Sequence, residues 1–133
     1  MMKIEQAIKR ELLADSGITS LIGERLYYVK APQNVTKPYV VFFKASGPRE
    51  YSHDGASKLA RPRFQFSCFA TTYDQAKQIA EAIRAAIEAF SGTMGGAGGV
   101  EVGSCFCINE SDMYEDNTQL FHVAVDYLIW HKE

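Results

Sequence analysis

Apolar residues recur at helical spacing near the N-terminus of the chain. Ile4, Ile8 and Leu12 lie four positions apart among charged residues, which predicts an amphipathic helix. We expect residues 15–17, Asp-Ser-Gly, to end it, and residues 19–22 to add one further helical turn.

The longest predicted helix spans residues 72–90. Thr72 and Gln75 have the spacing of a capping box, in which each side chain satisfies a free backbone N–H at the helix start. Gly92 is expected to close the other end. The apolar stripe of this helix comprises Ala76, Ile79, Ala80, Ile83, Ile87 and Phe90.

Five other stretches are rich in β-branched and aromatic residues and predict strands. In the third of them, clean alternation places Phe64, Phe66 and Cys68 on one face. The polar stretch of residues 47–60 precedes it and predicts an extended hairpin whose tip is too long for a tight turn. The five predicted strands are residues 26–29, 39–43, 63–69, 100–108 and 120–130.

The order of these elements predicts an α+β fold. We expect a single domain over residues 1–133, with a mainly antiparallel sheet of about four to five strands. The long helix and the N-terminal helix are expected to pack on that sheet. The glycine-rich run at residues 95–99 is interpreted as a flexible connector, and residues 110–116 as an acidic loop before the last strand.

Composition narrows the classes of function. The 133 residues are 47% hydrophobic and 23% charged, which is ordinary globular usage. Fourteen Lys and Arg against sixteen Asp and Glu give a net charge of −2, which disfavours a protein that coats DNA. No apolar run approaches the roughly 20 residues that span a bilayer, and three cysteines favour a reducing compartment. We expect a soluble protein that has no secretion signal and binds no membrane.

The glycines, cysteines and histidines match no catalytic or cofactor motif. The glycine run follows a helix and precedes a strand, which is the reverse of a phosphate-binding loop. Cys105 and Cys107 point the same way on a strand and could share a metal with Cys68 or His122, but their spacing favours buried thiols. We therefore predict no catalytic residue, no cofactor and no metal.

Two clusters of charge remain as candidate sites. Paired carboxylates can act as general acid and base or bind calcium, but the calcium-loop spacing is absent, and a solvated acidic loop that contacts a partner is favoured. The acidic cluster comprises Glu110, Asp112, Glu115 and Asp116. The basic cluster flanks the polar stretch and is either a solvated hairpin or a surface that meets an acidic partner or passing DNA. It comprises Arg49, Lys58, Arg61 and Arg63.

The order of motifs resembles the tail completion proteins of long-tailed bacteriophages and prophages, also called tail terminators or tail-to-head joining proteins. The resemblance covers nearly the whole chain and rests on motifs at particular separations. They are residues 4–8, 21–27 (LIGERLY), 31–33 (APQ) leading to 37–41 (KPYVV), 63–70 (RFQFSCFA) followed by 72–76, and 114–116 before the strand 121–130.

The resemblance implies an α+β fold with helices packed against a sheet, and a structural role without enzymatic activity. It implies a ring of subunits, most often six, seated between the tail tube and the head connector, with DNA passing through the centre without specific recognition. The partners would be other copies of the chain, the tail tube protein and a head connector or neck protein. The protein would be found in the bacterial host cytoplasm during assembly and then in the virion tail or neck.

No functional residue transfers from the family to residues 50–59 or 95–99, where the family varies. We hypothesise that residues 47–60 reach a neighbouring ring or the lumen, and that residues 110–116 meet a basic face on a neighbour. Two alternatives stay open: a small ligand-binding or enzymatic α+β domain, which would need a concave pocket with convergent polar groups, and another head-tail neck protein.

Overall fold

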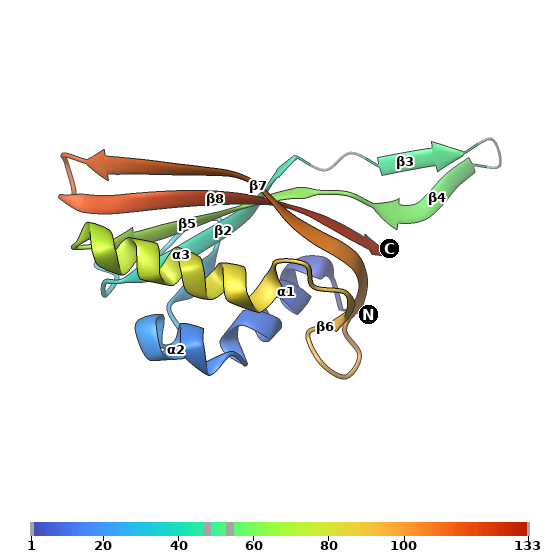
Figure 1. The fold of residues 1–133 in the computed structure, drawn as a ribbon, viewed down its shortest axis with the longest axis horizontal. Coiled ribbons are helices and arrows are strands. Elements are labelled where there is room, and N and C mark those ends of the chain that lie inside the picture. Colours follow the sequence, from blue (N-terminus) through green and yellow to red (C-terminus); the bar gives the residue numbers. More distant parts are fainter. Residues whose placement is uncertain (1, 47–48, 53–54, 133) are drawn as a thin grey trace.

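Three helices cover one face of a long sheet in the computed structural model (Figure 1). The structure describes residues 2–46, 49–52 and 55–132, with the backbone alone for 49–52 and 55–59. The helices are α1 (Ile4–Leu13), α2 (Ser16–Ile22) and α3 (Tyr73–Ile87). The strands are β1 (Leu26–Tyr28), β2 (Tyr39–Ser46), β3 (Arg49–Ser52), β4 (Gly55–Ala60), β5 (Arg63–Ala70), β6 (Gly92–Met94), β7 (Val100–Glu115) and β8 (Leu120–Lys132).

The strands form one sheet in which β8 is central. The pairing runs β1-β2-β5-β8-β4-β3, with β7 on β8 and β6 on β7. Ala60 of β4 and Val102 of β7 both pair with His131, so β4 and β7 lie on opposite edges of β8. Because β5 continues directly from β4, these two strands lie along the same edge of β8. The pairing of β1 with β2 is parallel and the other pairings are antiparallel.

Local sequence signals explain the starts of two helices. The carboxylate of Asp15 accepts the backbone N–H of Gly17 (2.8 Å) and of Ile18 (3.3 Å), so this residue caps α2 as well as ending the first helix. Thr72 Oγ1 accepts the N–H of Gln75 (3.2 Å) at the start of α3, as its capping role predicts. Both amphipathic helices lie where their spacing predicts them.

The α+β class is observed, but the predicted sheet of about four to five strands was too small, since the described residues form eight strands. The sheet is mainly antiparallel, and the prediction did not include the parallel pairing of β1 with β2. The polar stretch 47–60 contains β3 and β4. β2 and β5 pair antiparallel on either side of it, as the predicted hairpin requires, but the long tip is itself a two-stranded hairpin, with Ser52 opposite Gly55. Pairing between backbones does not require apolar side chains. The sequence of this projecting hairpin lacks the hydrophobic alternation that identifies a half-buried strand, so the pattern did not predict β3 and β4. We call β3 and β4 the arm.

The segment after α3 also differs from the prediction. α3 ends at Ile87, and Ala89 rather than a glycine takes the positive φ, at 63°. Gly92 begins β6, which pairs with the start of β7, so the glycines that follow form a hairpin turn instead of a flexible connector. The backbone N–H of Gly95 donates to Glu11 of α1 (3.0 Å) and fixes this turn on the helical layer.

The core lies between the helices and the inner face of the sheet. Ile79 and Ile83 of α3 are buried against the layer to which Phe66 and Tyr127 belong. The rings of Phe66 and Tyr127 meet edge to face, with centroids 5.7 Å apart. This packing fixes β5 and β8 side by side and holds α3 across them.

We predict that Tyr127→Phe raises the free energy of unfolding by about 1 kcal/mol. The ring of Tyr127 is fully buried, and its hydroxyl has no hydrogen-bond partner among the described residues. Burial also raises the pKa of this phenol. Removing the hydroxyl removes a desolvation cost and keeps the packing, as urea unfolding of both proteins will measure. A loss of stability greater than 1 kcal/mol would show that the hydroxyl has an internal partner.

Candidate assembly surface

The acidic cluster lies mostly on a strand. β7 pairs with β8 as far as Glu115 opposite Leu120, so Glu110, Asp112 and Glu115 are strand residues. Only Asp116 lies in the turn that follows. The predicted acidic loop over residues 110–116 was wrong because pairing with β8 extends β7 through polar positions.

Two of these carboxylates hold α3 against β7. Lys77 Nζ of α3 lies 2.5 Å from Glu110 Oε2 and 3.1 Å from Asp112 Oδ1. The hydroxyl of Tyr73 donates to Asp112 Oδ2 at 2.7 Å. Glu110 and Asp112 therefore act first as an internal clamp between the helical layer and the edge of the sheet.

The clamp favours the charged forms of Asp112 and Lys77 and the neutral form of Tyr73. The hydrogen bond from Tyr73, followed by that from Lys77, lowers the pKa of Asp112 below its usual range. The hydrogen bond to Glu110 raises the pKa of Lys77, and the bond to Asp112 raises the pKa of Tyr73. A general acid near neutral pH needs a carboxyl whose pKa is raised. The shift at Asp112 has the opposite direction and favours a structural role.

The other two acidic residues lie at the far end of the β7–β8 hairpin. Glu115 Oε1 accepts the hydroxyl of Thr118 at 3.0 Å, and its backbone oxygen accepts the N–H of Gln119 at 2.8 Å. Asp116 is exposed. Among the described residues no lysine or arginine forms an ion pair with Glu115 or Asp116, so the negative charge at this end of the hairpin is less compensated than that of the clamp.

Two residues of the basic cluster, Arg61 and Arg63, have described side chains, and their surroundings differ. Arg63 donates from Nε to Asp126 Oδ2 at 3.0 Å, and its Nη2 contacts the same oxygen. Asp126 lies on the central strand β8 with a side chain only 5% exposed. The guanidinium of Arg61 stacks 4.9 Å from the ring centroid of Trp130. The side chains of Arg49 and Lys58 lie outside the described part of the chain.

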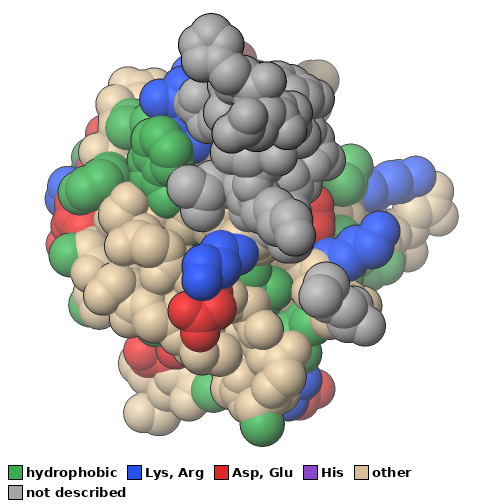
Figure 2. Space-filling model, turned by 90° about the vertical axis from the view of Figure 1, so that its right-hand side faces the viewer, with side chains coloured by type: hydrophobic (Ala, Val, Ile, Leu, Met, Phe, Trp, Pro, Cys, Tyr) green, Lys and Arg blue, Asp and Glu red, His purple; other side chains and the backbone are tan. Residues whose placement is uncertain are grey.

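The structure does not bring the acidic and basic clusters together. Arg63 pairs opposite Leu128 of β8, whereas Glu110 pairs opposite Val125 and Glu115 opposite Leu120, which are roughly 10 Å and 25 Å further along the strand. Figure 2 shows the face at the arm end, where the visible Lys and Arg side chains form separate groups beside Asp and Glu. The visible part of this face is therefore not a continuous basic band.

Residue-by-residue interpretation missed four exposed apolar side chains on β7, which lie on both faces of the strand because Met113 and Tyr114 are consecutive. Phe106 is 53% exposed, Ile108 43%, Met113 44% and Tyr114 50%. They account for four of the seven large apolar side chains that are exposed among the described residues. The sequence signal that could have revealed this part of β7 is the length of the final predicted strand, because a long strand needs a partner of similar length to pair along all of it. Exposed apolar side chains along one strand indicate a protein-binding surface.

Cys68 and Cys105 are buried, as the spacing of the cysteines favours, whereas Cys107 is only partly buried. Burial raises the pKa of Cys68, and it raises the pKa of Cys105 to about 12, so both remain protonated. In the part of the chain that the structure describes, no group of three His, Cys, Asp or Glu side chains is placed to hold a metal ion. The described helices include none that is long and apolar enough to cross a membrane.

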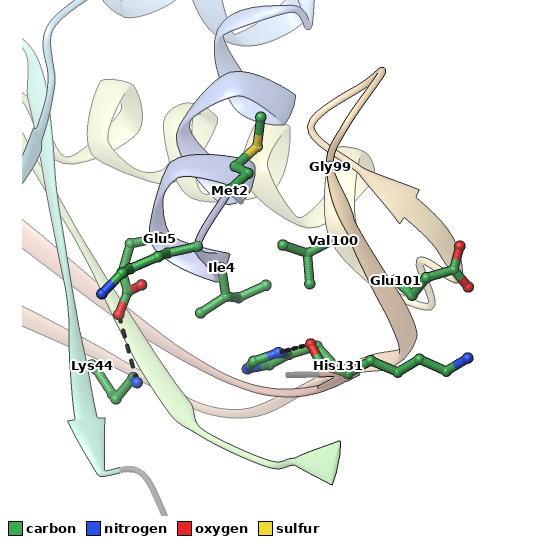
Figure 3. A pocket seen from close by; sticks show the side chains of 10 residues that line it. Met2, Ile4, Glu5, Lys44, Gly99, Val100, Glu101 and His131 are labelled. Atoms are coloured by element: carbon green, nitrogen blue, oxygen red, sulfur yellow. Dashed lines mark hydrogen bonds and ion pairs between the residues drawn. The ribbon is translucent and has the colours of Figure 1, made fainter. Parts of the chain in front are cut away.

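A half-open cavity of about 480 Å³ lies between the start of α1, the start of β7 and the end of β8 (Figure 3). Ile4 and Val100 face one another across it. Its charged lining is partly engaged, since Lys44 Nζ lies 3.6 Å from Glu5 Oε2. None of its lining residues is a serine, threonine or cysteine, so the cavity offers none of these nucleophiles. It has the concave shape that the ligand-binding alternative needs, and its lining includes the ionisable residues Glu101 and His131 besides the Lys44–Glu5 pair.

We predict that His122→Phe makes the free energy of unfolding less dependent on pH between about 6.5 and 5. His122 stacks on Phe69 with centroids 4.3 Å apart, and burial lowers the pKa of its imidazole despite Glu115 nearby (4.0 Å). The unfolded chain therefore takes up a proton more readily than the folded one. Stability from the neutral ring is fully present above about pH 6.5 and is lost as the pH falls through the lowered pKa.

Urea unfolding of the wild-type chain and the His122→Phe variant at pH 7.5 and 5 measures this effect. The carboxylates titrate in both proteins, so only the difference between the two slopes reports on His122. Equal slopes would show that the imidazole titrates alike in the folded and unfolded chains.

The fold and its surface together define a class: a small α+β assembly domain whose exposed features are an arm, a strand edge and apolar side chains. A model of the family described as "Tail completion protein gp17" matches residues 6–132. The chain therefore belongs to the tail completion protein family of bacteriophages, whose members are structural proteins of the phage tail. No curated protein matches the sequence.

Two solved structures share this fold. A chain from the virion of a native gene transfer agent particle superposes with a TM-score of 0.79 at 16% identity, covering 96% of this chain and 94% of that one. A second structure has a TM-score of 0.63 at 17% identity, covering 100% of this chain and 97% of that one. At these identities the likeness concerns the fold.

Proposed function

We propose that this chain is a non-enzymatic subunit of a ring, the hexamer that the family resemblance implies, which completes the phage tail tube and joins it to the head connector. The family match over residues 6–132 is the observation that carries this proposal. The similar chain in a gene transfer agent virion supports a place among the structural proteins of a particle.

The partners follow from that place. They are further copies of the chain, the tail tube protein and a head connector or neck protein. DNA passes through the ring without sequence readout, which agrees with a net charge of −2. The chain is made in the cytoplasm of the bacterial host and ends in the tail or neck of the virion.

The clusters of charge take different parts in this proposal. Arg61, at the base of the arm, faces a neighbouring ring or the lumen, and the same hypothesis for Arg49 and Lys58 stays a prediction because their side chains lie outside the described part of the chain. Glu115 and Asp116 meet a basic face on a neighbour. Glu110 and Asp112 contribute less to that contact because Lys77 already pairs with both.

A gene deletion in the phage or transfer agent that encodes the chain tests the proposal. We expect filled heads and tails to accumulate separately, and finished particles to return when the wild-type chain is supplied from a plasmid. Electron micrographs count the three species. Joined particles of normal yield in the deletion strain would overturn the joining role, and a deletion strain without tails would point to an earlier step in tail assembly.

A further inference from the structure

The outer edge of β7 is open over much of its length. On its inner side β7 pairs with β8 from Val102 to Glu115. On its outer side β7 pairs with β6 only from Val100 to Val102, and the backbone oxygen of Cys105 accepts the N–H of Ala89 (2.8 Å). From residue 106 to residue 115, no described strand pairs with this edge. A long unpaired edge is a template for another strand.

Two of the usual protections against pairing are missing from this edge, although two bulges and several acidic residues are present. Edge strands are commonly blunted by lysine, proline or short length, and residues 100–115 contain neither lysine nor proline. The opposite edge of the sheet, β1, has three residues and is followed by Val29 at a φ of 63°. A bulge interrupts β7 between Cys107 and Asn109, but the strand continues beyond it with Met113 and Tyr114 about half exposed. The two edges are therefore unequal, and β7 is the one able to accept a strand.

The arm provides strands that pair with few other described strands. β3 pairs with β4 alone among the described strands, and the arm joins the body through Leu59 opposite Lys132 and Ala60 opposite His131. Figure 1 shows the arm projecting beyond the helical layer, at the end of the long axis opposite the β7–β8 turn. A two-stranded hairpin is marginally stable by itself, and a third strand stabilises it.

We propose that the arm of one copy of this chain adds to the open edge of β7 in the next copy, residues 106–115, and so links the subunits head to tail. The inference rests on the proposed ring and names the surface that builds it. Each copy carries both halves of the contact at opposite ends, and such heterologous contacts generate rings. Main-chain pairing supplies affinity, and the exposed apolar side chains of β7 supply a matching surface.

Charge favours a second copy as the occupant. Residues 106–116 of the sequence contain four acidic residues and no basic one. Residues 49–61 contain three basic residues (Arg49, Lys58, Arg61) and two acidic ones (Glu50, Asp54), an excess of one positive charge. Residues 49–60 by themselves carry two basic and two acidic residues, and Lys77 already pairs with Glu110 and Asp112. The opposite charges that favour this contact and fix its register are therefore those of Arg61 at the base of the arm and of Glu115 and Asp116 at the end of the edge.

Two full-length variants and one control test the contact. The edge variant is Ile108→Lys with Met113→Lys, and the arm variant is Tyr51→Pro with Ala56→Pro. The control is Val29→Lys, which changes an exposed apolar residue (71%) beside the other edge of the sheet. Circular dichroism and thermal unfolding confirm that each variant folds. We expect the edge and arm variants to lose ring formation on purified tails by about tenfold or more, and the control to assemble as wild type does.

Mixing the two variants tests the head-to-tail arrangement. The edge variant retains its arm and the arm variant retains its β7 edge, so one contact can form between them. Light scattering is expected to show monomers for each variant alone and a species of twice 14.8 kDa for the mixture. An arm variant that dimerises alone would indicate pairing between two β7 edges and overturn the proposal.

Hydrogen exchange on the wild-type assembly separates this inference from the proposed function. Protection of the amides of residues 106–115 on ring formation is expected, because they gain strand partners. Rings whose β7 amides exchange as fast as those of the monomer, or an edge variant that assembles normally, would overturn the arm contact and leave the ring intact. Wild-type protein that forms no ring on tails would overturn both.

Discussion

Replacing Arg63 by methionine is expected to lower the free energy of unfolding by about 2–4 kcal/mol. Arg63 neutralises Asp126, whose carboxylate lies on the central strand with a side chain only 5% exposed. Without the guanidinium, a charge remains buried next to apolar strands, and the cost of desolvating it is no longer offset. Arg63 is itself 41% exposed, which keeps the expected loss below that of a fully buried pair. Urea unfolding of the two proteins measures the difference.

Two further variants serve as controls for the loss of stability expected of Arg63→Met. Adding Asp126→Asn to Arg63→Met removes the unpaired charge and is expected to recover a large part of the loss. Lys44→Ala breaks the pair with Glu5, in which both side chains are 36% exposed, and is expected to cost less than about 1 kcal/mol. If Arg63→Met costs no more than Lys44→Ala, water reaches Asp126 and the pair has no structural role.

This pair also affects how the assembly surface is tested. A charge reversal at Arg63 would weaken the fold and reduce assembly for that reason alone. Arg61, which stacks on Trp130 beside the arm, is the better position for probing a contact with a neighbour or with DNA. A defect seen only with Arg61→Glu would then report on the surface.

Gly99→Ala is expected to lower the free energy of unfolding by about 2–3 kcal/mol. A Cβ at this position would lie 2.0 Å from the backbone oxygen of Met94 and 2.9 Å from that of Gly96. Neither atom belongs to a flexible side chain, so the turn between β6 and β7 has to move. Because Gly95 in the same turn rests on Ala7 of α1, the movement also strains the contact with the helical layer.

Neighbouring glycines provide matched controls for this substitution. Gly98 has a φ of 77° with nothing within 4 Å of a Cβ, so alanine there is expected to cost about 1 kcal/mol. At Gly103 the first atom met lies 3.9 Å away, and alanine is expected to change stability by less than about 0.5 kcal/mol. Equal losses at Gly98 and Gly99 would show that backbone conformation, rather than the close approach to Met94, decides the cost. Thermal or urea unfolding of the three variants settles the order.

The helices and the central strands could be predicted from the sequence because each buries a regular stripe of side chains. Ile79 and Ile83 mark one face of α3, and Phe64 and Phe66 mark the inner face of β5. The arm, β6 and the outer half of β7 could not be predicted in this way. Their strand pairing is decided by a partner strand, and their side chains are polar, small or exposed.

The candidate site was less predictable than the fold for a related reason. Arg63 and Asp126 are 63 positions apart, and Lys77 is 33 positions from Glu110, so local patterns could not reveal that these charges pair internally. The sequence showed which charges cluster along the chain. The structure shows which of them are already engaged, and leaves Glu115 and Asp116 at the open end of the β7–β8 hairpin.

The location of the chain in a finished particle tests the central claim most directly. Cryo-electron microscopy of purified virions, with symmetry determined at the junction of head and tail, measures it. We predict a ring of this α+β fold on the head-proximal end of the tail tube, with six copies and a protein mass near six times 14.8 kDa. Density for this fold at the distal tip of the tail, or its absence from the particle, would contradict the account.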